Sequence, residues 1–191
     1  MTAIKTYVCP SVPARDTSKN GIFLNTPAGA CDYGPTYGLA GVTLAYGLVP
    51  LGTRLDPGML EVGYLDGPDT RTTTADVSDG LSNTLLMVER AGLWDRYRNG
   101  KRVTTFTTWG GVWGYLEPGI TVNPLDGDAP TALARGSCLM NCDNLYQPYG
   151  FHAGGVMTVR GDGSVGFLRQ TTSAVTLVAL IARNGGEVIG D

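Results

Sequence analysis

Glycine and proline divide this chain into short segments, and they constrain its fold more than any other feature of the sequence. The 191 residues include 28 glycines and 11 prolines, spread without a period. Glycine adopts positive φ angles and proline lacks a backbone N–H, so both residues mark turns. With 42% hydrophobic residues, the chain is long enough for one core. We therefore expect a single domain over residues 1–191, built largely of short strands and loops.

The clearest pair of strands lies near the C-terminus. Residues 156–159 and 164–168 are β-prone, and the sequence Arg-Gly-Asp-Gly joins them. The glycines of this connection supply the positive φ angles that a tight hairpin needs. His152, the only histidine of the chain, comes just before the first strand, and Asp162 lies in the turn.

Three further segments carry a local pattern. The apolar run at residues 85–88 predicts a buried strand. Asn99 and Gly100 predict a type I′ turn in a second hairpin. Apolar residues at helical spacing between 174 and 181 predict one helix, with a cap at Thr172 or Ser173 and a left-handed stop at Asn184-Gly185. An antiparallel sheet with a helix across it is an α+β fold. The basic residues of the second hairpin are expected to face solvent: Arg96, Arg98, Lys101 and Arg102.

The spacing of His152 and Asp162-Gly163, a histidine followed by nine residues and Asp-Gly, resembles the C-terminal signature of a planctomycete family of pilin-like proteins. That family is known by its prepilin-type, processing-associated H-X9-DG domain. The resemblance extends over most of the chain and includes residues 4–11, 79–89, 138–144 and 180–189.

The resemblance implies a pilin-like head: an α+β domain at the cell surface, noncatalytic, in a filament or a secretion-associated assembly. Its partners would be other pilin-like subunits. Members of the family begin with a prepilin leader and a long apolar helix, and neither is present in this sequence. The resemblance therefore implies a head without that helix, which would be its only contact with a membrane.

The net charge and the cysteine content limit the functions that this protein can have. The net charge of −3 and the pI near 5.1 exclude nonspecific binding to nucleic acid, which needs clustered Lys and Arg. Four cysteines, an even number, favour disulfides and an oxidising, extracellular compartment. We favour Cys138 with Cys142 and Cys9 with Cys31, although four cysteines allow three connectivities. Zinc at the Cys138–Cys142 spacing is disfavoured, because a structural zinc needs four ligands.

His152 and Asp162 have two interpretations. The two residues can act as a general base or as a metal site. Alternatively, a hydrogen bond between them can link the start of the first strand to the hairpin turn. We expect the structural role, because no serine-triad motif accompanies the histidine.

Three other groups of residues could bind a ligand or act in catalysis. Exposed aromatic rings on β-structure stack on sugars, so an aromatic cluster is a candidate polysaccharide site. The alternative function, a secreted glycoside hydrolase, needs a pair of carboxylates near that cluster. No cofactor is firmly indicated, although loop carboxylates offer oxygen ligands for calcium without EF-hand spacing. The aromatic residues are Trp94, Trp109, Trp113 and Tyr115; the carboxylates are Glu89, Glu117 and Asp79; the calcium candidates are Asp126 and Asp128.

Overall fold

The structure of the protein is a computed structural model. It describes residues 4–13, 29–39, 47–53, 58–60, 72–107, 111–112, 120–128 and 136–186.

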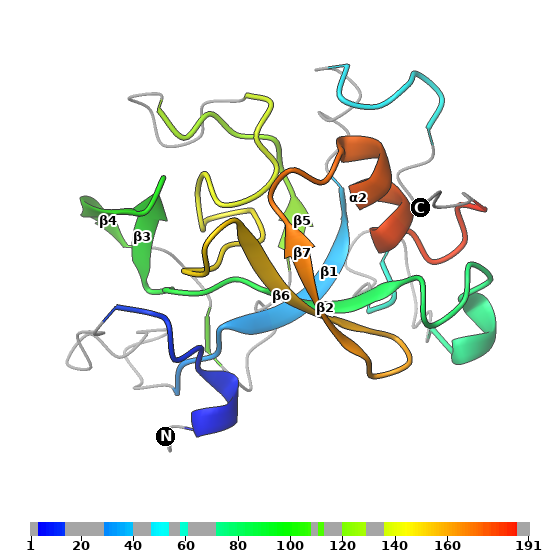
Figure 1. Cartoon of the computed structure of the whole chain (residues 1–191), viewed down its shortest axis with the longest axis horizontal. Coiled ribbons are helices and arrows are strands. Elements are labelled where there is room, and N and C mark those ends of the chain that lie inside the picture. Colours follow the sequence, from blue (N-terminus) through cyan, green and yellow to red (C-terminus); the bar gives the residue numbers. More distant parts are fainter. Residues whose placement is uncertain are drawn as a thin grey trace, which may run out of the picture.

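A five-stranded sheet forms the centre of the domain (Figure 1). The strand order is β5-β1-β2-β6-β7. Strands β1, β2, β6 and β7 are antiparallel neighbours, whereas β5 pairs with β1 in parallel. This sheet, together with one α-helix and a second small sheet, confirms the α+β class. The bounds are Tyr33–Leu39 for β1, Leu85–Glu89 for β2, Ile120–Val122 for β5, Gly155–Arg160 for β6 and Val165–Arg169 for β7.

Both predicted hairpins are present. Strands β6 and β7 pair with Val156 opposite Leu168 and Val159 opposite Val165. The second hairpin joins β3 (Asp95–Arg98) to β4 (Lys101–Thr107) and forms a separate two-stranded sheet. Asn99 and Gly100 have φ angles of 45° and 76°, as a type I′ turn requires.

The predicted helix is α2 (Ala174–Ile181), and it begins as expected. The Ser173 hydroxyl accepts the backbone N–H of Thr176 at 3.0 Å, which satisfies one N–H that the first turn leaves open. The end of the helix differs from the prediction. Ala182 is extended, with φ −61° and ψ 135°, so no left-handed stop forms at Asn184-Gly185.

The chain after α2 is held by a carboxylate instead. Asp79 accepts the backbone N–H groups of Gly185 and Gly186 at 2.7 and 3.0 Å. These hydrogen bonds draw the chain toward the turn that precedes β2, so the helix ends before the predicted stop. In the described part of the chain, no helix has the length and apolar character needed to cross a bilayer.

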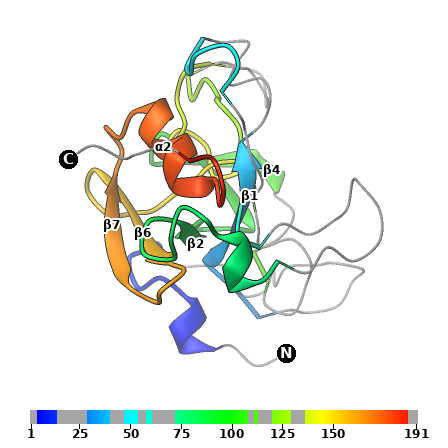
Figure 2. The ribbon, with the colours of Figure 1, turned by 90° about the vertical axis from the view of Figure 1, so that its right-hand side faces the viewer.

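The two faces of the sheet differ. Along β6, Val156 and Thr158 are buried, whereas Met157 and Val159 alternate with them and point to the other face. Helix α2 lies against β1 and β2 on the Val156 face, where Leu177, Val178 and Ile181 complete the core. Two short 3₁₀ helices, η1 (Lys5–Tyr7) and η3 (Thr74–Asp76), lie outside the sheet. Figures 1 and 2 show η1 and α2 on opposite sides of the strands.

Candidate functional site

Three segments that are distant in sequence meet at one end of the sheet. Cys9 follows η1, Glu89 is the last residue of β2, and His152 precedes β6. The Cys9 sulfur, a carboxylate oxygen of Glu89 and a ring nitrogen of His152 all lie within 4.8 Å of one another. We call these three residues the Cys9 cluster.

Asp32 holds Cys9 in place. Its carboxylate accepts the N–H of Cys9 at 2.8 Å and the N–H of Gly92 at 3.0 Å, and its own N–H donates to the carbonyl of Tyr7 at 2.8 Å. Asp32 is fully buried. The next residue, Tyr33, pairs with Glu89 across β1 and β2, so the same strand pairing brings the N-terminal segment to the end of β2.

Glu89 is a fully buried carboxylate with one satisfied and one open oxygen. Its Oε2 accepts the N–H of Met157 at 3.0 Å. A Cβ on Gly150 would lie 2.7 Å from the same oxygen, so a larger residue there would force the Glu89 carboxylate to shift. Its Oε1 has no hydrogen-bond partner among the described residues, and its contact with Nε2 of His152 measures 3.4 Å.

The imidazole cannot satisfy both neighbours. Nε2 of His152 lies 3.5 Å from Sγ of Cys9 and 3.4 Å from Oε1 of Glu89. A protonated Nε2 can donate to the carboxylate but cannot accept the Cys9 S–H, and a bare Nε2 can accept the S–H but faces the carboxylate with its lone pair. At 3.4 Å, the nitrogen–oxygen contact is also longer than an ordinary hydrogen bond. Nε2 therefore pairs with only one of its two neighbours at a time.

The environment of Cys9 disfavours a nucleophilic role. Its thiol is 1% exposed. Burial, and next the adjacent Glu89 carboxylate, raise the pKa of the Cys9 thiol to about 11. A reactive cysteine instead needs a lowered pKa and access for a substrate. Burial also raises the pKa of Tyr33, and the nearby Cys9 and Glu89 add to this effect. The donor set of thiol, carboxylate and imidazole is one that can hold a metal ion.

A pocket of about 500 Å³ lies beside His152. The histidine side chain is 28% exposed and forms part of its wall. Asn99, Asn141, Phe151 and Gln170 line other parts. Solvent therefore reaches the edge of the otherwise buried Cys9 cluster.

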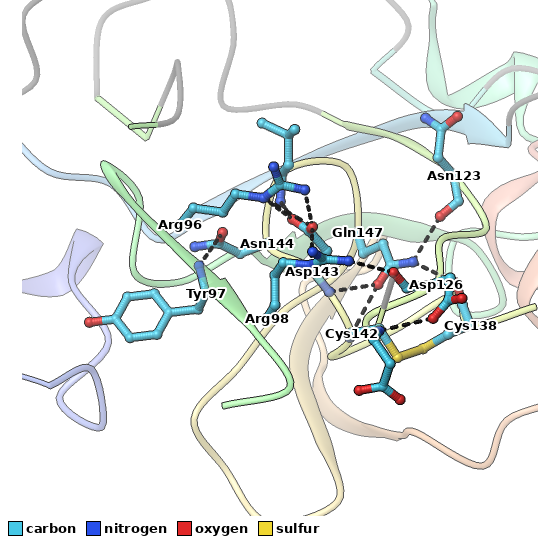
Figure 3. A network of polar contacts seen from close by, with 12 residues as sticks. Arg96, Tyr97, Arg98, Asn123, Asp126, Cys138, Cys142, Asp143, Asn144 and Gln147 are labelled. Carbon is cyan, nitrogen blue, oxygen red and sulfur yellow. Dashed lines mark hydrogen bonds and ion pairs between the residues drawn. A yellow bond between two sulfur atoms is a disulfide. The ribbon is translucent and has the colours of Figure 1, made fainter. Parts of the chain in front are cut away.

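A second buried polar region surrounds Asp143, and we call it the Asp143 network (Figure 3). Asp143 is 1% exposed and accepts two hydrogen bonds from Nε of Arg96 at 3.1 and 3.0 Å and another from its Nη2. Nε of Arg98 lies 3.4 Å away, and the N–H of Leu145 donates at 2.9 Å. The prediction that Arg96 and Arg98 face solvent is wrong, because the buried carboxylate draws both guanidinium groups inward. Arg96 is itself 1% exposed.

Two buried amides extend the Asp143 network. Asn144 accepts the N–H of Tyr97 at 3.0 Å and donates to the carbonyls of Ala91 and Asp95. Gln147 accepts the N–H groups of Cys142 and Asp143 and donates to the carbonyls of Asn123 and Cys138. The predicted disulfide between Cys138 and Cys142 is present and closes the same loop. The network therefore fixes a loop that has no regular secondary structure.

Two predicted pairings are absent. Cys9 and Cys31 are both buried thiols and do not form a disulfide. The Cys9 sulfur faces His152, whereas the Cys31 sulfur donates to the carbonyl of Tyr33 at 3.1 Å. In the described residues, His152 does not contact Asp162 either. The Asp162 carboxylate accepts the N–H of Ser164 at 2.8 Å within the turn, which lowers its pKa through the hydrogen bonds with Ser164.

The other predicted site residues do not gather into one site. Glu89 and Asp79 lie at opposite ends of the β2 region and hold different partners. Asp126 and Asp128 are exposed, and their carboxylates accept hydrogen bonds from the N–H of Asp128 and the amide of Asn99. Trp94 is partly exposed, with a buried Nε1 that has no partner among the described residues. Trp109, Trp113, Tyr115 and Glu117 lie outside the described residues.

Sequence reasoning did not assemble the Cys9 cluster. The only signal for it was that Cys9, Glu89 and His152 each lie in a segment that resembles the pilin-like family: residues 4–11, residues 79–89 and the H-X9-DG region. No spacing rule connects three residues so far apart.

Fold and site together define an α+β domain with a buried thiol, carboxylate and imidazole at one end of its sheet. The chain belongs to the family described as "Protein of unknown function (DUF1559)", whose model matches residues 1–174. No curated protein matches the chain, and no solved structure does.

Proposed function

We propose that this domain is a noncatalytic, pilin-like head that lies at the cell surface, in a filament or a secretion-associated assembly. The observation that carries the proposal is an apolar groove on the face of the sheet that α2 leaves open. The groove has a volume of about 360 Å³ and is lined mainly by Tyr7, Tyr33, Met87, Met157, Val159 and Val165.

The position of the groove suits an N-terminal apolar helix. Tyr7 belongs to the N-terminal segment and is 42% exposed, and Val165 on β7 is 67% exposed. Large apolar side chains on an open sheet face favour a partner that covers them. The apolar N-terminal helix of a neighbouring pilin-like subunit would bury these side chains, as the resemblance to pilin-like heads implies.

The disulfide supports the proposed location. Cys138 and Cys142 form a bond, and such bonds persist in oxidising compartments such as the cell surface. The partners in this proposal are other pilin-like subunits, which would present the covering helix.

Photo-crosslinking in the native cells tests the proposal. A photoreactive phenylalanine analogue at Val165 should crosslink the protein to a pilin-like subunit in material sheared from the cell surface. The same analogue at Val175, which is 49% exposed on α2, is the matched control and should crosslink less. Recovery of the protein only in the cytosol, or equal crosslinking from both positions, would contradict the proposal.

Polysaccharide binding is a second proposal, and the pocket beside His152 favours it. Amide-bearing residues next to a partly exposed aromatic residue, as at Asn141, Gln170 and Phe151, suit the hydroxyl groups and apolar faces of sugars. Retardation of the protein in gels that contain β-glucan or xylan tests this proposal. The glycoside hydrolase alternative has no support from the described carboxylates, because Glu89 and Asp79 do not face one another across a pocket.

A further inference from the structure

The Cys9 cluster has the composition and the geometry of a site for a transition-metal ion. We propose that Cys9, Glu89 and His152 bind one Zn²⁺ ion through Sγ, Oε1 and Nε2. The inference concerns a ligand that the proposed surface role neither requires nor supplies, so it stands independently of that role.

The spacing of the donor atoms fits a tetrahedral ion. With bonds of about 2.3 Å to sulfur and about 2.0–2.1 Å to nitrogen or oxygen, tetrahedral zinc places sulfur and nitrogen about 3.6 Å apart and nitrogen and oxygen about 3.3 Å apart. The protein places Sγ of Cys9 3.5 Å from Nε2 of His152, and Oε1 of Glu89 3.4 Å from the same nitrogen. Both distances to Nε2 therefore match those around a tetrahedral ion, and the ligand atoms of all three residues lie within 4.8 Å of one another.

The Oε1 atom of Glu89, which lacks a hydrogen-bond partner among the described residues, is the second observation that points to a ligand. The residue is fully buried, and Oε1 has no hydrogen-bond partner among the described residues. A buried carboxylate oxygen without a partner is costly, because it has lost its hydration. Oε1 lies 3.4 Å from Nε2 of His152, which is longer than an ordinary hydrogen bond. A metal ion satisfies all three atoms at once, because each then donates a lone pair.

Charge balance favours a divalent ion over a proton. When Cys9 binds as a thiolate and Glu89 as a carboxylate, the two ligands carry two negative charges, which Zn²⁺ neutralises inside the protein. Thiolate and imidazole select zinc and its neighbours in the transition series, whereas calcium and magnesium prefer oxygen ligands. Three protein ligands leave a fourth position for water, and the pocket beside the partly exposed His152 supplies it.

Cobalt provides a direct optical test in the intact, untagged protein. The Cys138–Cys142 disulfide is kept oxidised so that its sulfur atoms cannot bind the metal. Equimolar Co²⁺ should produce a thiolate-to-metal charge-transfer band together with the visible bands of a tetrahedral site, and Zn²⁺ should remove both. Co²⁺ that gives no charge-transfer band, or no binding at equimolar concentration, would overturn the proposal.

Ligand variants and a matched control assign the site. Cys9→Ser should abolish the charge-transfer band. Loss of an outer-shell partner alone costs about 10–100-fold in metal affinity, so Glu89→Gln and His152→Gln, which remove ligands, should weaken Zn²⁺ binding at least about 100-fold. Cys31→Ser removes a buried thiol outside the cluster and should leave binding unchanged. Equal affinity in the wild type and the Glu89→Gln and His152→Gln variants would contradict the assignment.

A protection experiment avoids variants that could fail to fold. Zn²⁺ should slow alkylation of Cys9 in the wild-type protein, as measured by peptide mapping, while Cys31 serves as the internal reference for overall opening of the fold. Equal protection of both thiols would indicate general stabilisation, and no protection of Cys9 would show that its sulfur is not a ligand. Either outcome overturns the proposal.

Discussion

The Asp143 network and the Cys9 cluster both bury charged groups, but they differ in how completely those groups are satisfied. The Asp143 carboxylate accepts hydrogen bonds from the Arg96 guanidinium and from a backbone N–H. The Glu89 carboxylate accepts one backbone N–H on Oε2, whereas Oε1 has only a 3.4 Å contact with His152. The two carboxylates are equally well hidden from solvent, at 1% and 0% exposure.

The difference separates a structural role from a binding role. A buried charge costs free energy unless a partner and hydrogen bonds replace its hydration. Around Asp143 the protein supplies those partners itself, so the network holds the loop at residues 142–147 and the hairpin β3–β4 together. Around Glu89 the protein leaves one oxygen open, which is expected where a ligand completes the set. The comparison can be tested by removing charges from each region in turn.

The largest loss in the free energy of unfolding is expected when the Asp143 network is disrupted. Asp143→Asn keeps the volume but leaves the buried Arg96 guanidinium without its counter-charge, and breaking a buried pair in this way costs about 3–5 kcal/mol. Urea unfolding measures the loss. Asp95→Asn is the matched control, because Asp95 pairs with the exposed Arg102 and an exposed pair contributes about 0–1 kcal/mol. Similar losses in the two variants would show that the network does not hold the fold.

A smaller change in the free energy of unfolding is expected when Cys9 titrates in the metal-free protein. The folded pKa of about 11 lies above the ordinary value of 9.0, so the folded state keeps its proton longer than the unfolded state. The resulting stability is fully present below the ordinary value of 9.0 and is lost as pH rises toward about 11. Urea unfolding at pH 8 and pH 10.5 should show this decline, and Cys9→Ala should reduce it. An identical decline in the variant would assign it to other groups.

The smallest change in the free energy of unfolding is expected for Glu89→Gln in the presence of a chelator. The amide retains an oxygen for the Met157 N–H and removes an incompletely paired charge, so the free energy of unfolding should change by no more than about 1 kcal/mol. Comparison with Asp143→Asn in the same urea series makes the contrast quantitative. A loss as large as that of Asp143→Asn would show that Glu89 stabilises the fold as Asp143 does, and the distinction between the two regions would fail.

Local patterns in the sequence predicted the local elements correctly. The turn at Asn99 and Gly100, the hairpin β6–β7 and the cap at Ser173 all depend on residues within a few positions of one another. The disulfide between Cys138 and Cys142 also closes over a separation of only four residues. Such interactions recur wherever the same residues occur, so the sequence alone predicts them.

Predictions based on charge and on residue type were wrong wherever a partner distant in sequence decides the environment of a side chain. Because Arg96 and Arg98 lie beside a turn, the sequence predicts that they face solvent. Their ion pairs with Asp143 instead hold them in the interior. Cys9 and Cys31 have the even count of a disulfide pair, yet each thiol has a different neighbour. Hydrophobic pattern does not predict such burial, because an ion pair can enter the interior only with its partner.

The sequence by itself determined the class of fold, the two hairpin turns, the start of α2 and the short disulfide loop, because each depends on backbone conformation or on contacts between near neighbours. Only the tertiary structure decided that Cys9 and His152, which are 143 residues apart, share a buried site with Glu89. The physical reason is that the pairing of β1 with β2 and of β2 with β6 sets which side chains meet at the end of the sheet. Strand pairing depends on the packing of the whole core, and no local signal specifies it.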